Sequence, residues 1–410
     1  MSQIVVADQR AGRIDLLDPV SGRLTELSAA SVLAEHAGVL PLADGSFAYA
    51  DDDAGAVVIA DPARAEALAR VPAAIPAEHL AVSPDGTRMV LTSGLGANME
   101  AFSDQVTVLT LREGRWRSRR VRCRTGEPGA AALDAGLVLR HREPGGIEFI
   151  PWSAVDAAGP HVPVLRGEVC EDVSDMAHGD VLDPLTGVFY TASERGVESF
   201  AVEGAGAEGA GAPGPDAQSG RPVPRGILPT SAGRAFFLRF CGRRRQLATT
   251  LRGGPADPKR WAEWTNSVWI ADLETGCALE TEIGPGLVFR CALSRSAVAV
   301  SRLHPDGDEL VTVSREDGSV LSRRPLEPME RGPRPGREPW DAADRRAVAA
   351  DPHGERVAVT RGGHGEVLLV DPLGGEPDVL VRTPGPLNDG GHLAWLPGPS
   401  PAELLDGVGR

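Results

Sequence analysis

The sequence predicts an all-β chain, and two observations support this prediction. Short apolar segments of four to six residues alternate with glycine-bearing turns, and no 3.6-residue apolar stripe persists along the 410 residues. These segments also recur in groups of four, with a period of roughly 40–55 residues. Four strands per unit at such a period indicate a β-propeller, in which each unit forms one blade.

The first hairpin of each unit is an apolar segment, a turn and a second apolar segment. Residues 78–94, EHLAVSPDGTRMVLTSG, show this pattern around a Ser-Pro-Asp-Gly turn, and residues 37–50, 178–193 and 343–361 repeat it. Seven units follow from the turns between first and second strands. We place these turns near Gly45, Gly86, Gly136, Gly187, Gly233, Ser296 and Gly354.

Four of the second hairpins share an aspartate at the turn. Residues 13–27, 56–70, 267–281 and 366–380 each contain a β-branched or leucine run, an Asp, a turn and a more polar segment. An Asp at this position is suited to accept hydrogen bonds from the turn amides. The more polar fourth strand is expected at the outer edge of its blade.

An eighth unit is divided between the two ends of the chain. Residues 392–400, HLAWLPGPS, provide an isolated first strand, whereas residues 4–12, IVVADQRAG, begin with a second strand. The C-terminal strand would complete the first blade and close the ring without leaving open sheet edges. The count is therefore eight blades, with seven as the alternative if the weak unit at 130–166 or at 287–326 is misread.

Residues 1–410 are read as one propeller domain with one insertion. Residues 203–220 are rich in Gly, Ala and Pro and contain no β-branched or aromatic residue. This composition is typical of a flexible loop, which would extend the last turn of the fifth blade.

The hairpins resemble those of the YVTN-type and quinoprotein-amine-dehydrogenase-like propellers, and the SPDG turn also occurs in WD40-like families. This resemblance implies an architecture and little chemistry. The third strands do not end in Trp-Asp, as true WD40 repeats do. The sequence contains no C-x-x-C-H haem motif, and nothing in it identifies a quinone cofactor.

Composition excludes several partners. A net charge of −15 argues against a nucleic-acid-binding surface, and no apolar run approaches the ~18 residues that a membrane span needs. The N-terminal residues MSQIVVADQRAG do not have the pattern of a signal peptide. Five cysteines without a C-x-x-C pair are typical of a reduced protein, so a cytoplasmic location is expected.

The richest loops are predicted on the face where the first strands begin. They comprise residues 92–105, 251–266 and 327–346. Long loops at one end of a rigid scaffold often bind ligands. The alternative is that the tryptophans of these loops only pack on neighbouring blades. The candidate substrate-binding residues are Trp261, Trp264, Asn266, Asn98, Glu100 and Trp340.

Four histidines are predicted near the mouth of the channel on this face. His79 and His392 occupy the same register position, and His178 and His36 lie one and two residues earlier. The four imidazoles could bind one divalent metal ion, the candidate cofactor. Alternatively, they cap strand ends and bond loop backbone. The candidate catalytic residues are His79, His178, His392, Glu78 and Asp389.

The leading functional hypothesis is an enzyme of specialised metabolism that modifies a small molecule or peptide in the channel mouth. Its chemistry would use histidine–carboxylate acid–base catalysis or a metal, as in a lyase, hydrolase or cyclase. The competing hypothesis is a non-catalytic scaffold that binds a protein partner on the same face. His141, between Arg140 and Arg142, is expected at a solvated strand edge.

Overall fold

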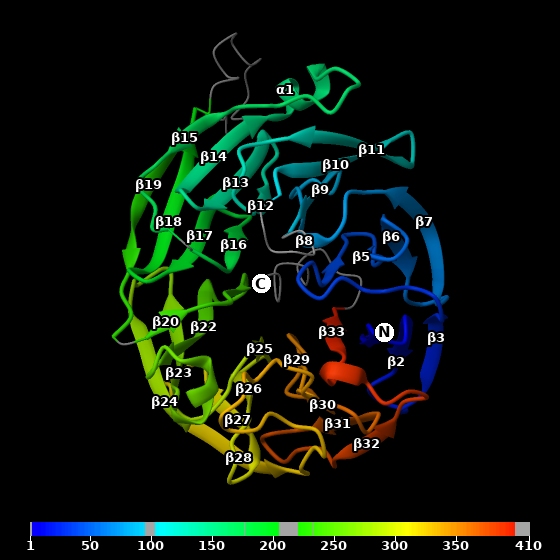
Figure 1. The fold of residues 1–410 in the computed structure, drawn as a ribbon, viewed down its shortest axis with the longest axis vertical. Coiled ribbons are helices and arrows are strands. Elements are labelled where there is room, and N and C mark those ends of the chain that lie inside the picture. The colour runs from blue at the N-terminus through cyan, green and yellow to red at the C-terminus, as the bar shows by residue number, and fades with distance from the viewer. Residues whose placement is uncertain (1, 95–102, 176, 205–219, 232, 398–410) are drawn as a thin grey trace.

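Eight antiparallel sheets surround a central axis in the computed structural model, which describes residues 2–94, 103–175, 177–204, 220–231 and 233–397 (Figure 1). Each sheet is one propeller blade. The innermost strand of each blade borders the channel, and the outermost strand faces solvent. The all-β fold class and the count of eight blades are thus confirmed, as is the fold-level resemblance to propeller repeats.

The first four blades run as follows, each from its inner to its outer strand. Blade one contains β33 (His392–Leu396), β1 (Gln3–Asp8), β2 (Arg13–Leu17) and β3 (Leu24–Ser28). Blade two contains β4 (Val39–Pro41), β5 (Phe47–Asp51), β6 (Ala56–Asp61) and β7 (Glu66–Pro72). Blade three contains β8 (Ala77–Val82), β9 (Arg88–Ser93), β10 (Gln105–Arg112) and β11 (Arg115–Arg122). Blade four contains β12 (Gly129–Ala132), β13 (Gly136–Arg142), β14 (Gly145–Pro151) and β15 (Glu168–Cys170).

The other four blades continue around the ring in chain order. Blade five contains β16 (Asp180–Asp183), β17 (Val188–Ser193), β18 (Gly196–Glu203) and β19 (Arg221–Leu228). Blade six contains β20 (Arg234–Ala235), β21 (Arg239–Cys241), β22 (Gln246–Gly253), β23 (Thr265–Asp272) and β24 (Ala278–Pro285). Blade seven contains β25 (Cys291–Leu293), β26 (Ala297–Arg302), β27 (Asp308–Ser314) and β28 (Val320–Leu326). Blade eight contains β29 (Val348–Ala350), β30 (Val357–Arg361), β31 (Glu366–Val370) and β32 (Val379–Arg382).

The ring closes through pairing between the two ends of the described chain. Strand β33 runs antiparallel to β1, with Ala7 opposite His392 and Gln3 opposite Leu396. In Figure 1 the red β33 lies beside the blue strands of blade one. The C-terminal strand therefore completes the first blade, as the sequence predicts.

Apolar faces of neighbouring blades form the core. One cluster joins Val57 and Ile59 of β6 to Met89 and Leu91 of β9, all buried. Outer strands bury far less; β11, for example, is mostly exposed and rich in arginine. This gradient agrees with the polar fourth strand expected from the sequence.

The aspartates of the second hairpins accept hydrogen bonds from turn amides, as expected. Asp272 Oδ1 accepts the backbone N–H groups of Glu274 at 3.0 Å and Thr275 at 2.8 Å. Asp18 Oδ1 accepts the N–H of Val20 at 2.8 Å. These bonds satisfy turn donors that would otherwise need water.

Two details of the turns differ from the sequence expectation. The turn between the first two strands of blade six spans residues 242–245, not Gly233, because β21 pairs with β22 and adds a second inner strand to β20. The connection between β14 and β15 is long and contains helix α1 (Trp152–Ala157). It crosses to blade three, where Arg88 donates to both carboxylate oxygens of Asp156 at 2.9 and 2.8 Å.

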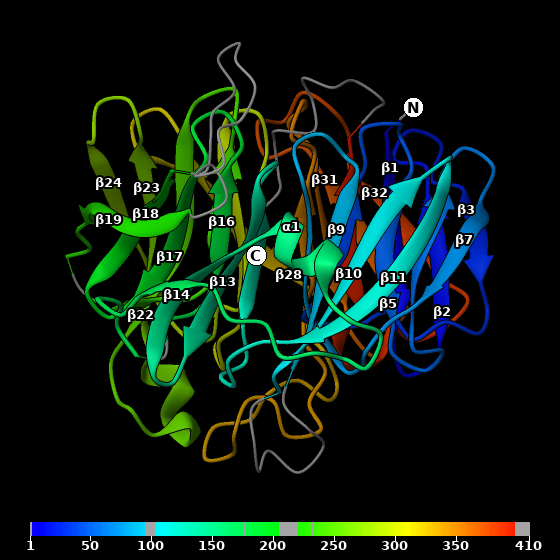
Figure 2. The same ribbon diagram turned by 90° about the horizontal axis from the view of Figure 1, so that it is seen from above.

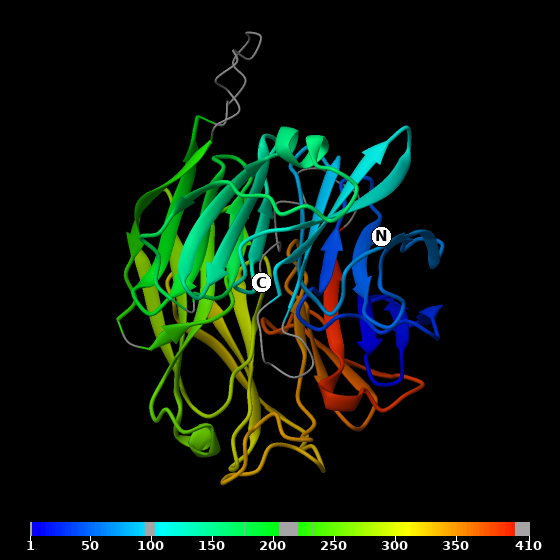
Figure 3. The same ribbon diagram turned by 45° about the horizontal axis from the view of Figure 1, so that its top comes forward.

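The long loops gather on one face. Figures 2 and 3 show the 3-10 helix η1 (Pro258–Glu263) on the same face as the loop at 327–346. A second 3-10 helix, η2 (Asn388–Gly390), directly precedes β33.

No helix in the described part of the chain is long and apolar enough to cross a membrane. Most of the insertion at 203–220 lies outside the described residues.

Candidate functional site

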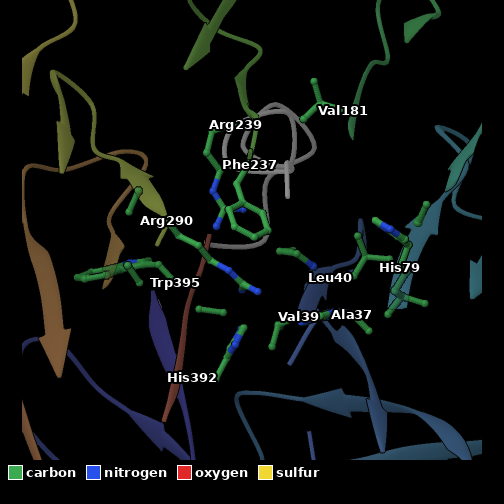
Figure 4. A pocket seen from close by; sticks show the side chains of 18 of the residues that line it. Ala37, Val39, Leu40, His79, Val181, Phe237, Arg239, Arg290, His392 and Trp395 are labelled. Atoms are coloured by element: carbon green, nitrogen blue, oxygen red, sulfur yellow. The ribbon is translucent and has the colours of Figure 1, made fainter. Parts of the chain in front are cut away.

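A cavity of about 630 Å³ occupies the channel and is lined by the inner strands and the turns that precede them. Apolar side chains such as Leu40, Val181 and Trp395 form much of its wall, together with histidines and arginines (Figure 4). This volume is in the range of pockets for small organic molecules. A mainly apolar cavity with a few converging polar groups is a default candidate for a ligand site.

His36 and Glu78 form a hydrogen-bonded pair at the edge of this cavity. His36 lies in the turn before β4, and Glu78 lies near the start of β8, so the pair joins blades two and three. His36 Nδ1 is 2.7 Å from Glu78 Oε2. The carboxylate is buried, whereas 55% of the His36 side chain is exposed. The hydrogen bond to Glu78 raises the pKa of His36 against the opposing effect of burial.

Gly94 leaves room for the Glu78 carboxylate. A Cβ added at Gly94 would lie 2.7 Å from Glu78 Oε2, the oxygen that bonds to His36. The Gly94 N–H in turn donates to the carbonyl of Pro76 at 2.9 Å. The close packing of Gly94 therefore helps to hold Glu78 in position for the pair.

His79 and His178 lie next to the pair, around a small cavity that His36, Glu78, Phe237 and Arg290 also line. His79 is buried, and His178 is half-buried. The His178 ring contacts Phe237 edge-on, with ring centroids 5.3 Å apart. Burial, followed by the nearby arginine charges, lowers the pKa of His178 well below its usual value. His178 is therefore neutral at physiological pH.

His392 stands apart from these three histidines, beside Gly38, whose added Cβ would lie 3.7 Å from the His392 ring. Figure 4 shows His392 and His79 at different sides of the cavity. Among the described residues, no three His, Cys, Asp or Glu side chains form a group that could hold a metal ion. The predicted ligand set of His36, His79, His178 and His392 is therefore not assembled. Imidazoles on separate blades bind one metal ion only if their ring nitrogens converge on one centre.

Three arginines from blades six, seven and eight line the channel and were missed by the sequence analysis. Arg239 begins β21 of blade six, Arg290 precedes β25 of blade seven, and Arg345 precedes β29 of blade eight; all three line the cavity. Their positions are close to equivalent in the three blades. An alignment of the inner strands, which includes RFC at 239–241 and FRC at 289–291, could have revealed the first two.

The aromatic loop of blade six is structural. Trp261 and Trp264 are buried in a cluster with Leu287 and Leu303. The amide of Asn266 donates to the carbonyls of Trp264 at 3.1 Å and Gly286 at 2.8 Å. The prediction that Trp261, Trp264 and Asn266 bind substrate is not supported by this packing, and the alternative reading of these tryptophans agrees with it.

The remaining rim residues divide into two groups. Trp340 stacks on Trp264 with centroids 6.5 Å apart, is partly exposed and lines the cavity, so it keeps a place in the candidate site. Asp389 also lines the cavity and forms an ion pair with Arg10 at 2.8 Å. Asn98 and Glu100 lie outside the described residues.

The expectation of a solvated edge at His141 is wrong. Arg140 and His141 are fully buried, and each has a carboxylate partner. Arg140 Nη2 donates to Asp180 of blade five at 2.8 Å, and His141 Nε2 lies 2.8 Å from Glu148 of β14. Blade four thus buries a polar strand because neighbouring strands supply the opposite charges.

No family model and no curated protein matches the chain. Solved structures do match. Apo AztD from Citrobacter koseri has a TM-score of 0.63 at 12% identity, with 97% of this chain and 98% of that chain covered. The dihydro-heme d1 dehydrogenase NirN, in complex with DHE, has a TM-score of 0.58 at 16% identity, covering 95% and 74%. The periplasmic gluconolactonase PpgL from Pseudomonas aeruginosa has a TM-score of 0.50 at 14% identity, covering 97% and 99%.

At identities this low, the similarity shows that the fold is shared and says nothing about the chemistry. The chain is an eight-bladed β-propeller with a ligand-sized cavity in its channel. The gluconolactonase PpgL is periplasmic, so the fold does not decide the compartment, and the cytoplasmic location stays a prediction.

Proposed function

We propose that the protein is an enzyme that modifies a small molecule in its channel, with His36 and Glu78 as the acid–base pair. The observation that carries this proposal is the 2.7 Å hydrogen bond between His36 Nδ1 and the buried Glu78 carboxylate at the edge of a 630 Å³ cavity. Glu78 fixes the orientation of the imidazole. Nε2 is then the ring nitrogen that exchanges a proton with a bound molecule.

The raised pKa of His36 indicates the direction of proton transfer. A pKa above the usual value increases the imidazolium fraction of His36 relative to an unpaired histidine at the same pH. His36 would therefore donate a proton from Nε2 to a developing negative charge, and would act as a base in the reverse direction or at higher pH. His79, His392 and Asp389 line the same cavity and would contact the bound molecule.

The alternative of a protein-binding scaffold has less support. A scaffold face is expected to carry an exposed aromatic patch. Among the large apolar side chains that are exposed in the described part of the chain, Trp340 is the one aromatic residue. The dehydrogenase NirN and the gluconolactonase PpgL show that the fold can carry enzymes, and they support nothing more specific.

Incubation of the purified protein with a pooled library of small metabolites, followed by mass spectrometry, tests the proposal. The wild type is expected to convert at least one compound. His36→Gln should lower its turnover by roughly 10²–10⁴-fold without loss of binding. His161→Gln, which alters an exposed histidine away from the cavity, is the matched control and should retain full turnover. Binding without any conversion by the wild type would overturn the catalytic proposal in favour of a binding protein.

A further inference from the structure

The histidines and the arginines that line the cavity come from different blades. The histidines at its wall come from blades one, two and three, and the arginines from blades six, seven and eight. In Figure 4 Arg239 and Arg290 both extend from their strands towards the middle of the cavity. A protein with a net charge of −15 thus has a locally cationic wall inside its channel.

Arg239 has no carboxylate partner among the described residues. Its Nε donates to the backbone carbonyl of Cys291 at 3.1 Å, which neutralises no charge. Burial, with a smaller contribution from the charge of Arg290, lowers the pKa of Arg239 to about 10. The guanidinium still remains a cation at neutral pH.

Arg290 likewise forms no ion pair with a carboxylate of the described chain. Its Nη2 donates to the carbonyl of Glu35 at 3.3 Å, and its guanidinium carbon lies 4.9 Å from the centre of the Phe237 ring. No carboxylate of the described chain lies within ion-pair distance of it. Burial lowers the pKa of Arg290; the charges of Glu35 and Glu78 oppose this shift, and the charge of Arg345 adds to it.

Arginines that are buried in the body of the molecule have partners on the chain, which are carboxylates for Arg140 and Arg346 and neutral acceptors for Arg315. Arg140 bonds to Asp180 at 2.8 Å, and Arg346 bonds to Asp308 at 2.8 Å. Desolvating a guanidinium is costly unless an anion compensates it. Arg239 and Arg290 differ in that they line the cavity and form no ion pair within the described chain, so an anion bound in the cavity would supply their counter-charge.

We propose that Arg239 and Arg290 bind the carboxylate of an organic acid whose apolar body fills the channel cavity. This inference rests on the proposed function and defines the class of its substrate. Guanidinium groups match the geometry of a carboxylate, and the apolar wall formed by residues such as Leu40, Val181 and Trp395 suits a hydrocarbon or aromatic body.

A carboxylate fits better than a phosphate. Glu35 and Asp389 also line the cavity, and Glu35 approaches Arg345 at 3.5 Å. These acidic groups limit the net positive charge of the wall. The wall therefore suits a monoanion better than a dianion.

Calorimetric titration of the full chain with phenylacetate, indole-3-acetate and 4-methylpentanoate tests the inference. Each acid is compared with its neutral amide, and inorganic phosphate is titrated in parallel. At least one acid should bind at least tenfold more tightly than its amide and than phosphate. Arg239→Gln/Arg290→Gln should remove this preference. Arg117→Gln, which deletes an exposed arginine on β11, should leave it unchanged.

Several results would overturn the inference: no acid binds, the amides bind equally well, phosphate binds best, or Arg117→Gln has the same effect as the double variant. Melting curves and the charge-preserving variants Arg239→Lys and Arg290→Lys distinguish lost charge from lost folding, since the lysine variants should retain part of the preference. Carboxylate binding without turnover would leave this inference standing and contradict the catalytic proposal. Turnover of neutral compounds that is insensitive to the arginine variants would support the catalytic proposal and contradict carboxylate binding by Arg239 and Arg290.

Discussion

His36 Nδ1 lies 2.7 Å from Glu78 Oε2, and this bond connects the turn before the inner strand of blade two to the inner strand of blade three. The two residues are 42 positions apart in the sequence, which is about one blade. Each blade therefore contributes one half of the pair, and its geometry depends on how the two blades pack.

The first prediction concerns the pKa of His36, which should fall in Glu78→Gln because the hydrogen bond to the carboxylate is the main cause of its rise. The carbon-bound proton signals of the His36 ring, followed by NMR over a pH series, measure this change. His36→Gln assigns the signal. An unchanged pKa in Glu78→Gln would show that the pair does not form.

The same pair has a consequence for stability. The pKa of His36 is higher in the folded chain than the unfolded value of about 6.5. The pair therefore stabilises the fold fully below that value, and the contribution is lost as pH rises through the folded pKa. In Glu78→Gln, the free energy of unfolding should therefore change less with pH between the unfolded and the folded pKa of His36.

The ring could be predicted from the sequence because its signals are local. A glycine turn between two apolar segments, such as SPDG at 83–86, specifies a hairpin by itself. Repetition of that hairpin then gives the number of blades. The weak unit at 130–166 also forms a blade, since its strands β12, β13 and β14 pair in chain order as in the other blades.

The site could be predicted only in part, because its residues meet across blades. The register of the inner strands led to the histidines at the channel, yet it does not determine where each ring points. The polar triplet at 140–142 suggested exposure because its partners, Asp180 and Glu148 among them, lie on other strands. The sequence spacing of Arg239 and Arg290 does not predict that both side chains line the same wall of the channel.

The second prediction concerns the buried pair of Arg140 and Asp180. Asp180→Asn should lower the free energy of unfolding by about 3–5 kcal/mol, because it leaves a buried guanidinium without a counter-charge. Urea unfolding measures this loss. Glu203→Gln removes one partner of the exposed pair with Arg225 and should cost only about 0–1 kcal/mol. Equal losses in the two variants would contradict the importance of burial.

Gly129→Ala is an independent test of the same region. A Cβ at Gly129 would lie 1.9 Å from Asp180 Oδ2 and 2.8 Å from Arg140 Nη2. The extra methyl group must displace the ion pair. A destabilisation comparable to that of Asp180→Asn is therefore expected in the same urea experiment.

The third prediction concerns closure of the ring. Deletion of residues 388–410 removes β33 and exposes the edge of β1, so the truncated chain should aggregate or unfold at lower temperature. Deletion of 398–410 alone retains β33 and is the control. Size-exclusion chromatography and thermal melting compare the two. A 388–410 truncation that stays monomeric with unchanged stability would contradict the closure.

The fourth prediction concerns the cysteine thiols. Burial raises the pKa of Cys123 to about 12 and that of Cys291 to about 11. At pH 8 the thiolate fraction of Cys123 would be roughly 10⁻⁴, and the thiolate is the form that reacts. Exposed Cys277 should therefore be alkylated first by iodoacetamide, with the sites identified by mass spectrometry.

Alkylation of Cys291 also tests the packing around Arg239, because the carbonyl of Cys291 accepts a hydrogen bond from Arg239 Nε at 3.1 Å. In Arg239→Gln, Cys291 should stay protected if strands β21 and β25 keep their packing, and any loss of ligand binding then reflects the missing charge. All five cysteines should react in urea, which sets the reference rate. Modification of Cys291 as fast as Cys277 in the folded wild type would show that these inner strands open, and a rigid binding wall would then be untenable.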